Sequence, residues 1–372
     1  MSNFWKQLPK PFFAIAPMAD VTDAAFRQII CKYSRHGQVG GGPDVVWTEF
    51  VSADGLVSRG REALMKDLMF SENERPIVVQ FFSSKPENMK EASRMCAELG
   101  FDGIDINMGC PDRAIEKQGC GSAMIKTPDK AVEIIQAVKD GIALAGKDIP
   151  VSVKTRIGYN TNEIDTWIPL LLKQNISALT IHARTRKEMS KVPARWEHIK
   201  EVVDIRNTLG VDTVIIGNGD VTDISDGLSK AKESGCDGVM IGRALFGNPW
   251  LFDKHRNVVS KPSSWHRFVT WLLPKDLAKR IVGDKRYTQM DVPIQDRLNV
   301  LVEHSELFEK LLGDVKHFAI MKKHFKAYVH GFRGSKELRV RLMEEGDNAQ
   351  KVEKAIREHM RTLREQTQTK KT

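Results

Sequence analysis

The sequence predicts an α/β fold, a (β/α)8 TIM barrel followed by a C-terminal domain made only of helices. From Pro11 to about Arg256, eight short β-branched runs alternate with longer segments of helical periodicity, about 30 residues apart. The chain has 372 residues, which accommodates one barrel of about 250 residues and a smaller second domain. We expect a barrel over residues 1–256, a linker or insertion over 257–293 and a helical domain over 294–372.

The expected strands are short runs rich in β-branched and apolar residues. They cover residues 12–18, 45–50, 76–82, 103–109, 150–156, 178–184, 212–220 and 238–243. Helical patterns lie between them, for example at 87–99, 130–144 and 223–234, and turn or cap residues precede the last two. The glycine run 40–42 precedes the second strand and does not follow the first, so we expect a flexible loop there.

The C-terminal part has a different pattern. Residues 257–293 contain Pro262, Pro274, Gly283 and Pro293 and show no sustained period, apart from a possible short helix around 265–273. Helical patterns then cover 294–312, 315–330, 335–345 and 349–365, and glycines end the first two. We therefore expect a helical bundle.

The composition excludes a disordered chain, because 41% of the residues are hydrophobic and 28% are charged. No apolar run approaches the roughly 20 residues of a membrane span, and the N-terminal segment lacks the pattern of a signal peptide. The five Cys residues are scattered without a C-x-x-C pair, which predicts neither a disulfide framework nor a zinc site. We expect a cytoplasmic, monomeric protein with no membrane association and no metal.

The net charge of +9 comes entirely from residues 261–372, because residues 1–260 contain 33 basic and 33 acidic side chains. In the predicted helix 315–330, Lys316, Lys322, Lys323 and Lys326 share one arc, and Arg333 follows. Such a face could lie along phosphates, which indicates a polyanionic partner. An ordinary solvated lysine-rich helix surface fits the same pattern.

Polar side chains stand at the carboxyl ends of almost all expected strands, where barrel enzymes place their active sites. The residues at these strand ends are Met18, Glu49, Gln80, Asn107 with Cys110, Lys154 with Arg156, His182 with Arg184, Asn218-Gly219-Asp220 and Gly242-Arg243. The last two groups match the usual phosphate site of barrels, in which glycines admit the anion and a cation adds charge. Tight turns and a salt-bridged Arg243 are the alternative.

Two of these residues have competing interpretations. Lys154 could stabilise negative charge on a cofactor ring or an enolate, or it could pair with Asp105 or Glu49. His182 could contact a phosphate or a ring, act as a general acid, or be a buried structural imidazole.

Cys110 lies between Gly109 and Pro111, just past the fourth strand, on a constrained loop over the predicted barrel mouth. A free thiol with a pKa near 8.5 is mostly protonated at neutral pH, which suits proton donation as well as nucleophilic attack. Cys120 is the competing candidate, and the other three Cys residues are expected in the core.

Together these residues resemble the tRNA-dihydrouridine synthase family. The similar segments are Ala16–Asp23 with Phe26-Arg27, Asp105–Pro111, Lys154–Gly158, His182–Arg186, Gly217–Asp220 and Met240–Ala244, in order over about 12–250. A weaker match lies at 315–345, around Met321-Lys322-Lys323-His324. The resemblance implies an FMN-containing barrel, a helical tRNA-binding domain, and NADPH-dependent reduction of the C5=C6 bond of uridine in tRNA.

The resemblance also implies roles for residues. Cys110 would be the catalytic proton donor. Binding of FMN would involve Pro17, Met18, Gln80, Asn107, Lys154, His182, Asn218, Gly219, Asp220, Gly242 and Arg243. Contacts to tRNA would come from Arg156, Arg184, Arg186, Lys316, Lys322, Lys323, Lys326 and Arg333.

Two other functions remain open from the sequence. An FMN barrel that reduces a small pyrimidine or enone, similar to dihydroorotate dehydrogenase, would not need the basic C-terminal domain. A non-catalytic tRNA-binding protein would not need Cys110, Lys154, His182 and Arg243 together.

Overall fold

Eight parallel strands form the centre of the protein. The computed structural model describes residues 3–254 and 292–369. The strands are β1 (Phe12–Ile15), β2 (Val46–Ser52), β3 (Ile77–Phe82), β4 (Gly103–Met108), β5 (Val151–Arg156), β6 (Ala178–His182), β7 (Val214–Asn218) and β8 (Gly238–Ile241). They pair in the order β1-β8-β7-β6-β5-β4-β3-β2. A parallel bridge between Ala14 and Val45 joins the two edges and closes the barrel, which confirms the predicted fold class.

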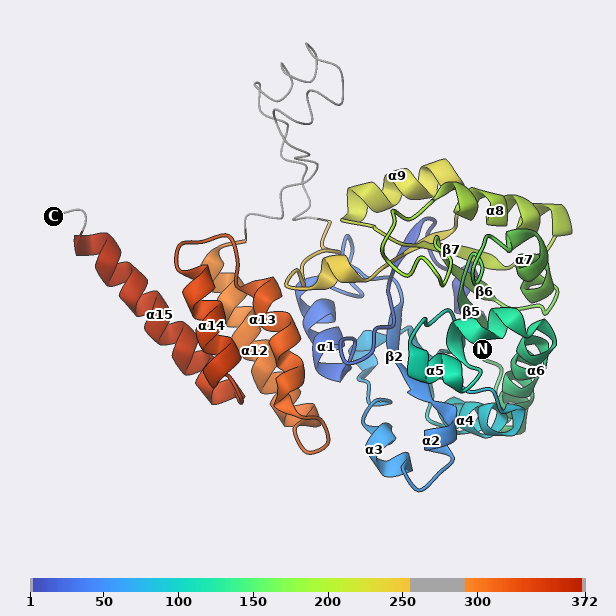
Figure 1. Cartoon of the computed structure of the whole chain (residues 1–372), viewed down its shortest axis with the longest axis horizontal. Coiled ribbons are helices and arrows are strands. Elements are labelled where there is room, and N and C mark those ends of the chain that lie inside the picture. Colours follow the sequence, from blue (N-terminus) through green and yellow to red (C-terminus); the bar gives the residue numbers. More distant parts are fainter. Residues whose placement is uncertain (1–2, 255–291, 370–372) are drawn as a thin grey trace, which may run out of the picture.

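Helices cover the outside of the barrel (Figure 1). They are α1 (Ala24–Tyr33), α2 (Ala53–Leu56), α3 (Arg61–Met65), α4 (Pro86–Glu98), α5 (Arg113–Lys117), α6 (Pro128–Leu144), α7 (Ile164–Leu172), α8 (Glu197–Leu209) and α9 (Ile224–Ser234), with short 3-10 turns η1 (Phe4–Lys6), η2 (Glu72–Glu74), η3 (Gly121–Lys126) and η4 (Arg243–Leu245). The cap signals read from the sequence are present: Pro128 opens α6, and the Asp223 side chain accepts a hydrogen bond from the Asp226 N–H at the start of α9.

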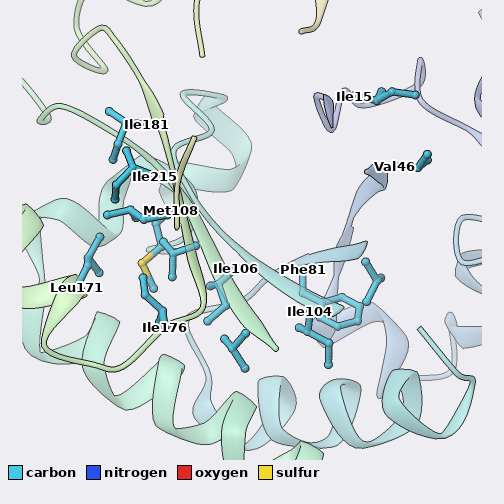
Figure 2. Close-up of a cluster of buried hydrophobic side chains, with 14 of the residues drawn as sticks. Ile15, Val46, Phe81, Ile104, Ile106, Met108, Leu171, Ile176, Ile181 and Ile215 are labelled. Carbon is cyan, nitrogen blue, oxygen red and sulfur yellow. The ribbon is translucent and has the colours of Figure 1, made fainter. Parts of the chain in front are cut away.

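Side chains alternate along the strands between two apolar layers. Figure 2 shows the layer between strands and helices, where residues such as Ile15, Phe81, Ile106 and Ile215 lie together. The other cluster fills the barrel interior, and it includes Phe12, Ala14, Trp47 and Met240 together with Trp5 of η1, whose ring lies 5.5 Å from that of Trp47. Apolar side chains thus fill the barrel interior, and a cavity in the described part of the chain lies at the carboxyl ends of the strands, where barrels place their active sites.

The C-terminal helices are α12 (Ile294–Leu312), α13 (Lys322–Tyr328), α14 (Ser335–Glu345) and α15 (Ala349–Thr369), with η5 (Phe318–Met321) before α13. They lie beside α1 (Figure 1). One apolar cluster joins them to the barrel, since it contains Ala25 and Ile29 of α1 and Trp250 as well as Leu298 and Phe325. The predicted domain division stays a prediction, because the possible helix at 265–273 and most of the segment 257–293 lie outside the described residues.

The expected single helix over 315–330 is wrong. The His317 side chain accepts a hydrogen bond from the Ala319 N–H and starts η5, and α13 begins only at Lys322. Lys316 therefore lies before the helix and not on a lysine face. Its ammonium is 2.6 Å from Glu49 Oε2 and 2.7 Å from Asp67 Oδ1, so this lysine joins the helical domain to the barrel and does not present an exposed charge.

The glycine run before β2 is also less free than expected. The Lys254 N–H donates to the Gly40 carbonyl, and a Cβ on Gly42 would lie 3.0 Å from Phe252 Cβ. The loop is thus packed against the segment after β8. Among the helices of the described ranges, none has the length and apolarity that a membrane crossing requires.

Candidate functional site

An open cavity lies at the carboxyl ends of the strands, where barrel enzymes bind their ligands. All the residues assigned to cofactor binding from the sequence line it: Pro17, Met18, Gln80, Asn107, Lys154, His182, Asn218, Gly219, Asp220, Gly242 and Arg243. Cys110 and Arg156 line it as well. The sequence analysis did not assign Ala16, Phe50, Gly109, Pro111, Ser190, Val221 and Met240, which complete the wall.

A chain of hydrogen bonds orients the polar groups between β3 and β5. Buried Asp105 accepts from Gln80 Nε2 at 2.6 Å and from Ser152 Oγ at 2.6 Å. Gln80 Oε1 then accepts from Asn107 Nδ2 at 3.0 Å. Asn107 Oδ1 in turn accepts the N–H groups of Gly109 and Cys110, at 3.1 and 3.0 Å. The amides at the cavity are therefore held in one orientation by a carboxylate beneath them.

A bulge in β2 explains why Phe50 was missed. The register against β3 shifts between Trp47 and Phe50, so two residues of β2 oppose one residue of β3. Bulges of this kind redirect side chains. Phe50 faces the cavity, while Glu49, which we expected at the mouth, bonds to Lys316 and accepts the Asp20 N–H. The regular alternation of side chains along a strand predicts Glu49 at the cavity, and it does not predict that Phe50 takes this place.

The β7 and β8 ends form an anion-compatible corner. Within the described residues, the backbone N–H groups of Gly219, Asp220, Gly242 and Arg243 donate to no protein acceptor. Gly219 has φ +127°, and a Cβ there would lie 2.7 Å from Ala194 Cβ, so only glycine keeps this corner open. Arg243 Nη2 donates to Asp220 Oδ1 at 2.6 Å.

His182 and Arg184 lie beneath the same corner. Arg184 is buried, pairs with Asp220 and donates from Nη1 to His182 Nε2 at 3.0 Å. Because a guanidinium only donates, the ring proton of His182 is assigned to Nδ1. Burial, followed by the charges of Arg156 and Lys154, holds the pKa of His182 well below its ordinary value. The imidazole is therefore neutral.

Lys154 lines the cavity and has a strongly lowered pKa. Burial, followed by repulsion from Arg156, lowers its pKa to about 8. The two partners considered from the sequence do not bond to it: Nζ donates to Asn218 Oδ1 at 3.2 Å, and Glu49 is engaged by Lys316. The Lys154 ammonium is thus a cavity-facing cation that changes charge close to neutral pH.

Of the described cysteines, Cys110 is half-buried and the other four are buried. Burial raises the pKa of the Cys110 thiol above its ordinary value, so the thiol is protonated at neutral pH. Cys120 is 1% exposed and does not line the cavity, and burial raises its pKa to about 11. The geometry favours Cys110 over Cys120 as the reactive thiol, and Cys31, Cys96 and Cys236 are in the core as expected.

The basic residues expected to contact a polyanion divide into two groups. Arg156 and Arg184 are buried; Arg156 donates to the carbonyls of Gly109, Thr185 and Met189. Arg186 pairs with Glu116, and Lys316 is half-buried and pairs with two carboxylates. Arg184 pairs with Asp220, and Lys316 pairs with Glu49 and Asp67, so neither charge is free of a protein partner. Their expected contacts to tRNA stay predictions.

The second group lies on the helical domain. Lys323, Lys326 and Arg333 are exposed, and Lys323 pairs with Asp20 at 3.0 Å, beside the cavity wall. Lys322 is partly exposed and donates to the Met343 carbonyl at 2.6 Å. No group of His, Cys, Asp and Glu side chains in residues 3–254 and 292–369 is arranged to hold a metal ion.

Comparison with known proteins gives one consistent family. The family model described as dihydrouridine synthase (Dus) matches residues 14–367. A "Probable tRNA-dihydrouridine synthase" of Staphylococcus aureus (strain COL) is 39% identical over 344 residues, which are 92% of this chain and 91% of that protein. The "Probable tRNA-dihydrouridine synthase 2" of Bacillus subtilis (strain 168) is 38% identical over 343 residues, 92% of each chain.

Similarity to solved structures is lower. Histamine dehydrogenase from Rhizobium sp. 4-9 superposes with a TM-score of 0.45 at 12% identity, over 65% of this chain and 45% of that one. A dihydroorotate dehydrogenase (DHODH) structure from Eimeria tenella has a TM-score of 0.39 at 13% identity, over 55% and 61% of the two chains.

Proposed function

The chain belongs to the dihydrouridine synthase family, and from this premise we propose that it reduces the C5=C6 bond of uridines in tRNA, with bound FMN and NADPH as the reductant. The observation that carries the proposal is the cavity itself, in which a protonated thiol, an oriented pair of amides and an anion corner face one space. The family and the names of the relatives favour this function over a small-pyrimidine reductase and over a non-catalytic tRNA-binding protein.

The residues of the cavity fit FMN. The open N–H groups of Gly219 and Gly242 and the guanidinium of Arg243 suit its phosphate, and a Cβ on Gly219 would fill the space. The oriented side-chain amides of Gln80 and Asn107 suit the polar edge of the flavin ring. Pro17 and Met18 provide an apolar surface for its face. FMN held there would supply a hydride to C6 of the uracil, and NADPH would supply its electrons.

In this proposal Cys110 donates the proton that C5 of the uracil needs after C6 has received the hydride. The C4 carbonyl makes the C5=C6 bond electron-poor at C6, and reduction there leaves negative charge shared between C5 and the C4 oxygen. The Cys110 Sγ–H gives its proton to C5, which its raised pKa permits because the thiol is protonated beforehand. The charges of Arg156 and Lys154, which lower the pKa of Cys110, stabilise the thiolate that remains.

The helical domain holds the RNA in this proposal. Lys323, Lys326 and Arg333 are exposed on it, and the Lys323–Asp20 pair joins this surface to the loop after β1. Phosphate contacts from such side chains give affinity that depends strongly on salt. The target uridine must leave its stack to enter the cavity.

One experiment tests the function. The purified protein is incubated with unmodified tRNA, FMN and NADPH, and the tRNA is digested for nucleoside mass spectrometry. We expect a flavin absorption spectrum and a nucleoside that is heavier than uridine by two hydrogen atoms. A protein that cannot be loaded with flavin, or tRNA whose uridine remains unchanged, contradicts the proposal.

The charge of Lys154 predicts how FMN affinity depends on pH. With a pKa of about 8, the ammonium is charged below that pH and neutral above it, so anionic FMN should bind about tenfold more weakly at pH ~9 than at pH ~7. Fluorescence titration of the flavin measures this. In Lys154→Gln the affinity should be low and nearly independent of pH, whereas Lys139→Gln, which alters a partly buried lysine of α6 with a lowered pKa, should keep the dependence. Equal pH dependence in Lys154→Gln and the wild type would refute the assignment.

A further inference from the structure

Hydrogen bonds hold the backbone of Cys110 at both its N–H group and its carbonyl group. The Cys110 N–H donates to Asn107 Oδ1 at 3.0 Å. The Cys110 carbonyl accepts twice from the same residue, from the Ser122 N–H at 3.0 Å and from Ser122 Oγ at 2.9 Å. Because both peptide groups around the Cys110 Cα are bonded, these two partners fix the backbone from which the thiol side chain projects.

The Ser122 hydroxyl has a second neighbour. Its Oγ also lies 3.0 Å from Glu116 Oε1, and the Ser122 side chain is completely buried. The Glu116 carboxylate is in turn held by Arg186, with Nε 2.8 Å from Oε1 and Nη2 bonded to Oε2. Burial works to raise the pKa of Glu116, but the hydrogen bonds from Arg186, Tyr159 and Ser122 outweigh it and leave the pKa below its ordinary value. Glu116 is therefore an ionised acceptor.

Packing leaves this loop little freedom. Gly121 has φ +60°, and a Cβ there would lie 2.7 Å from the Cys110 carbonyl oxygen and 3.2 Å from Cys110 Cβ. The segment of Ser122 thus lies directly against the backbone of Cys110. A hydroxyl has one hydrogen to give, and the Ser122 Oγ–H shares it between the Cys110 carbonyl at 2.9 Å and Glu116 Oε1 at 3.0 Å. The two N–H groups that Arg186 donates hold the Glu116 carboxylate in the place where it can accept this hydrogen.

We propose that Ser122, supported by Glu116 and Arg186, is a positioning residue that aims the Cys110 thiol at the uracil. The proposal rests on the function proposed above. Ser122 touches neither substrate nor cofactor: it acts by fixing the carbonyl of Cys110, and Glu116 acts by fixing the hydroxyl of Ser122. Arg186, expected from the sequence as a tRNA contact, has an internal role in this arrangement.

The first test measures two steps of the reaction separately: the reduction of bound flavin by NADPH, and the reduction of uridine by the reduced flavin. In Ser122→Ala, reduction of bound flavin by NADPH and the affinity for tRNA should stay within about twofold of wild type, while transfer to uridine slows about tenfold. Ser93→Ala removes a similarly buried hydroxyl, which donates to the Met89 carbonyl within α4, and should leave both halves unchanged. If Glu116 acts through Ser122, adding Glu116→Gln to Ser122→Ala should cause no further loss. Equal slowing of both halves would refute the positioning role.

Alkylation of the thiols gives a readout that needs no activity. Iodoacetamide is added to the flavin-loaded protein, and the five cysteines are followed separately by peptide mass spectrometry. We expect Cys110 in Ser122→Ala to react about three to ten times faster than in wild type, because a looser loop exposes it, while Cys31, Cys96, Cys120 and Cys236 stay protected.

The outcomes decide between the two proposals. An unchanged Cys110 alkylation rate in Ser122→Ala, or simultaneous reaction of all five cysteines, overturns the positioning role, since the latter indicates general unfolding. A wild-type protein that forms no dihydrouridine overturns the proposed function alone, because the alkylation result does not depend on it.

Discussion

Replacing Cys110 with alanine should lower dihydrouridine formation by about 10²- to 10⁴-fold, the usual contribution of a positioned general acid. The thiol is half-buried, lines the cavity and is protonated because burial raises its pKa. Alanine removes the proton donor but leaves the hydrogen bonds of the residue 110 backbone to Asn107 and Ser122 in place. Flavin and tRNA affinities should therefore stay close to those of wild type, and nucleoside mass spectrometry and flavin titration measure the two effects.

Cys120→Ala is the matched control. Cys120 lies only ten positions further along, at the start of η3, but it is 1% exposed and does not line the cavity. This variant should retain nearly full activity. If it is inactive while Cys110→Ala works normally, the assignment of the proton donor is wrong.

Neutralising the exposed basic side chains of the helical domain should have the second large effect. In the triple variant Lys323→Gln, Lys326→Gln and Arg333→Gln, we expect tRNA affinity at about 0.1 M salt to fall by roughly 10- to 100-fold. The slope of log affinity against log salt should become shallower by about 2 to 3, since each lost phosphate contact removes about 0.7 to 0.9. Binding titrations over a salt series give both values.

A control variant with the same change in net charge distinguishes the loss of a local tRNA-binding surface from a general loss of positive charge. Lys147, Lys173 and Lys232 are exposed and lie just before β5, β6 and β8, at the end of the barrel opposite the cavity. Their triple replacement by Gln changes the net charge equally and should leave the salt slope unchanged. Equal losses in the two triple variants would contradict a docking surface on the helical domain. Deletion of that domain is a poorer test, because it uncovers Ala25, Ile29 and Trp250.

Much of the site could be predicted from the sequence, because a parallel barrel brings the carboxyl ends of all its strands to one rim. The alternation of strands and helices places Gln80, Asn107, Lys154, His182 and Asn218 at one rim, although 138 positions separate the first from the last. Sequence order and the parallel topology are sufficient for this, since every strand ends at the same edge. The roles of these residues toward FMN stay predictions until tested.

Contacts between distant segments could not be predicted in the same way. Lys316 was expected on an exposed lysine face, but its partner Glu49 lies 267 positions away, and helical periodicity carries no information about such a pair. Arg184 was expected to contact tRNA, and the sequence does not show that its side chain is buried and pairs with Asp220, 36 positions further along. Phe50 enters the cavity because of a bulge in β2, which strict alternation along a strand does not reveal.

The central claim is that a protonated Cys110 thiol completes the reduction of a uridine held over bound flavin. An anaerobic single turnover tests it most directly: protein whose flavin has been reduced beforehand is mixed with unmodified tRNA, and flavin absorbance and nucleoside composition are followed together. The account predicts one dihydrouridine per flavin reoxidised in the wild type, with far slower formation in Cys110→Ala. Flavin that stays reduced beside unchanged tRNA, or equal rates in the two proteins, contradicts it.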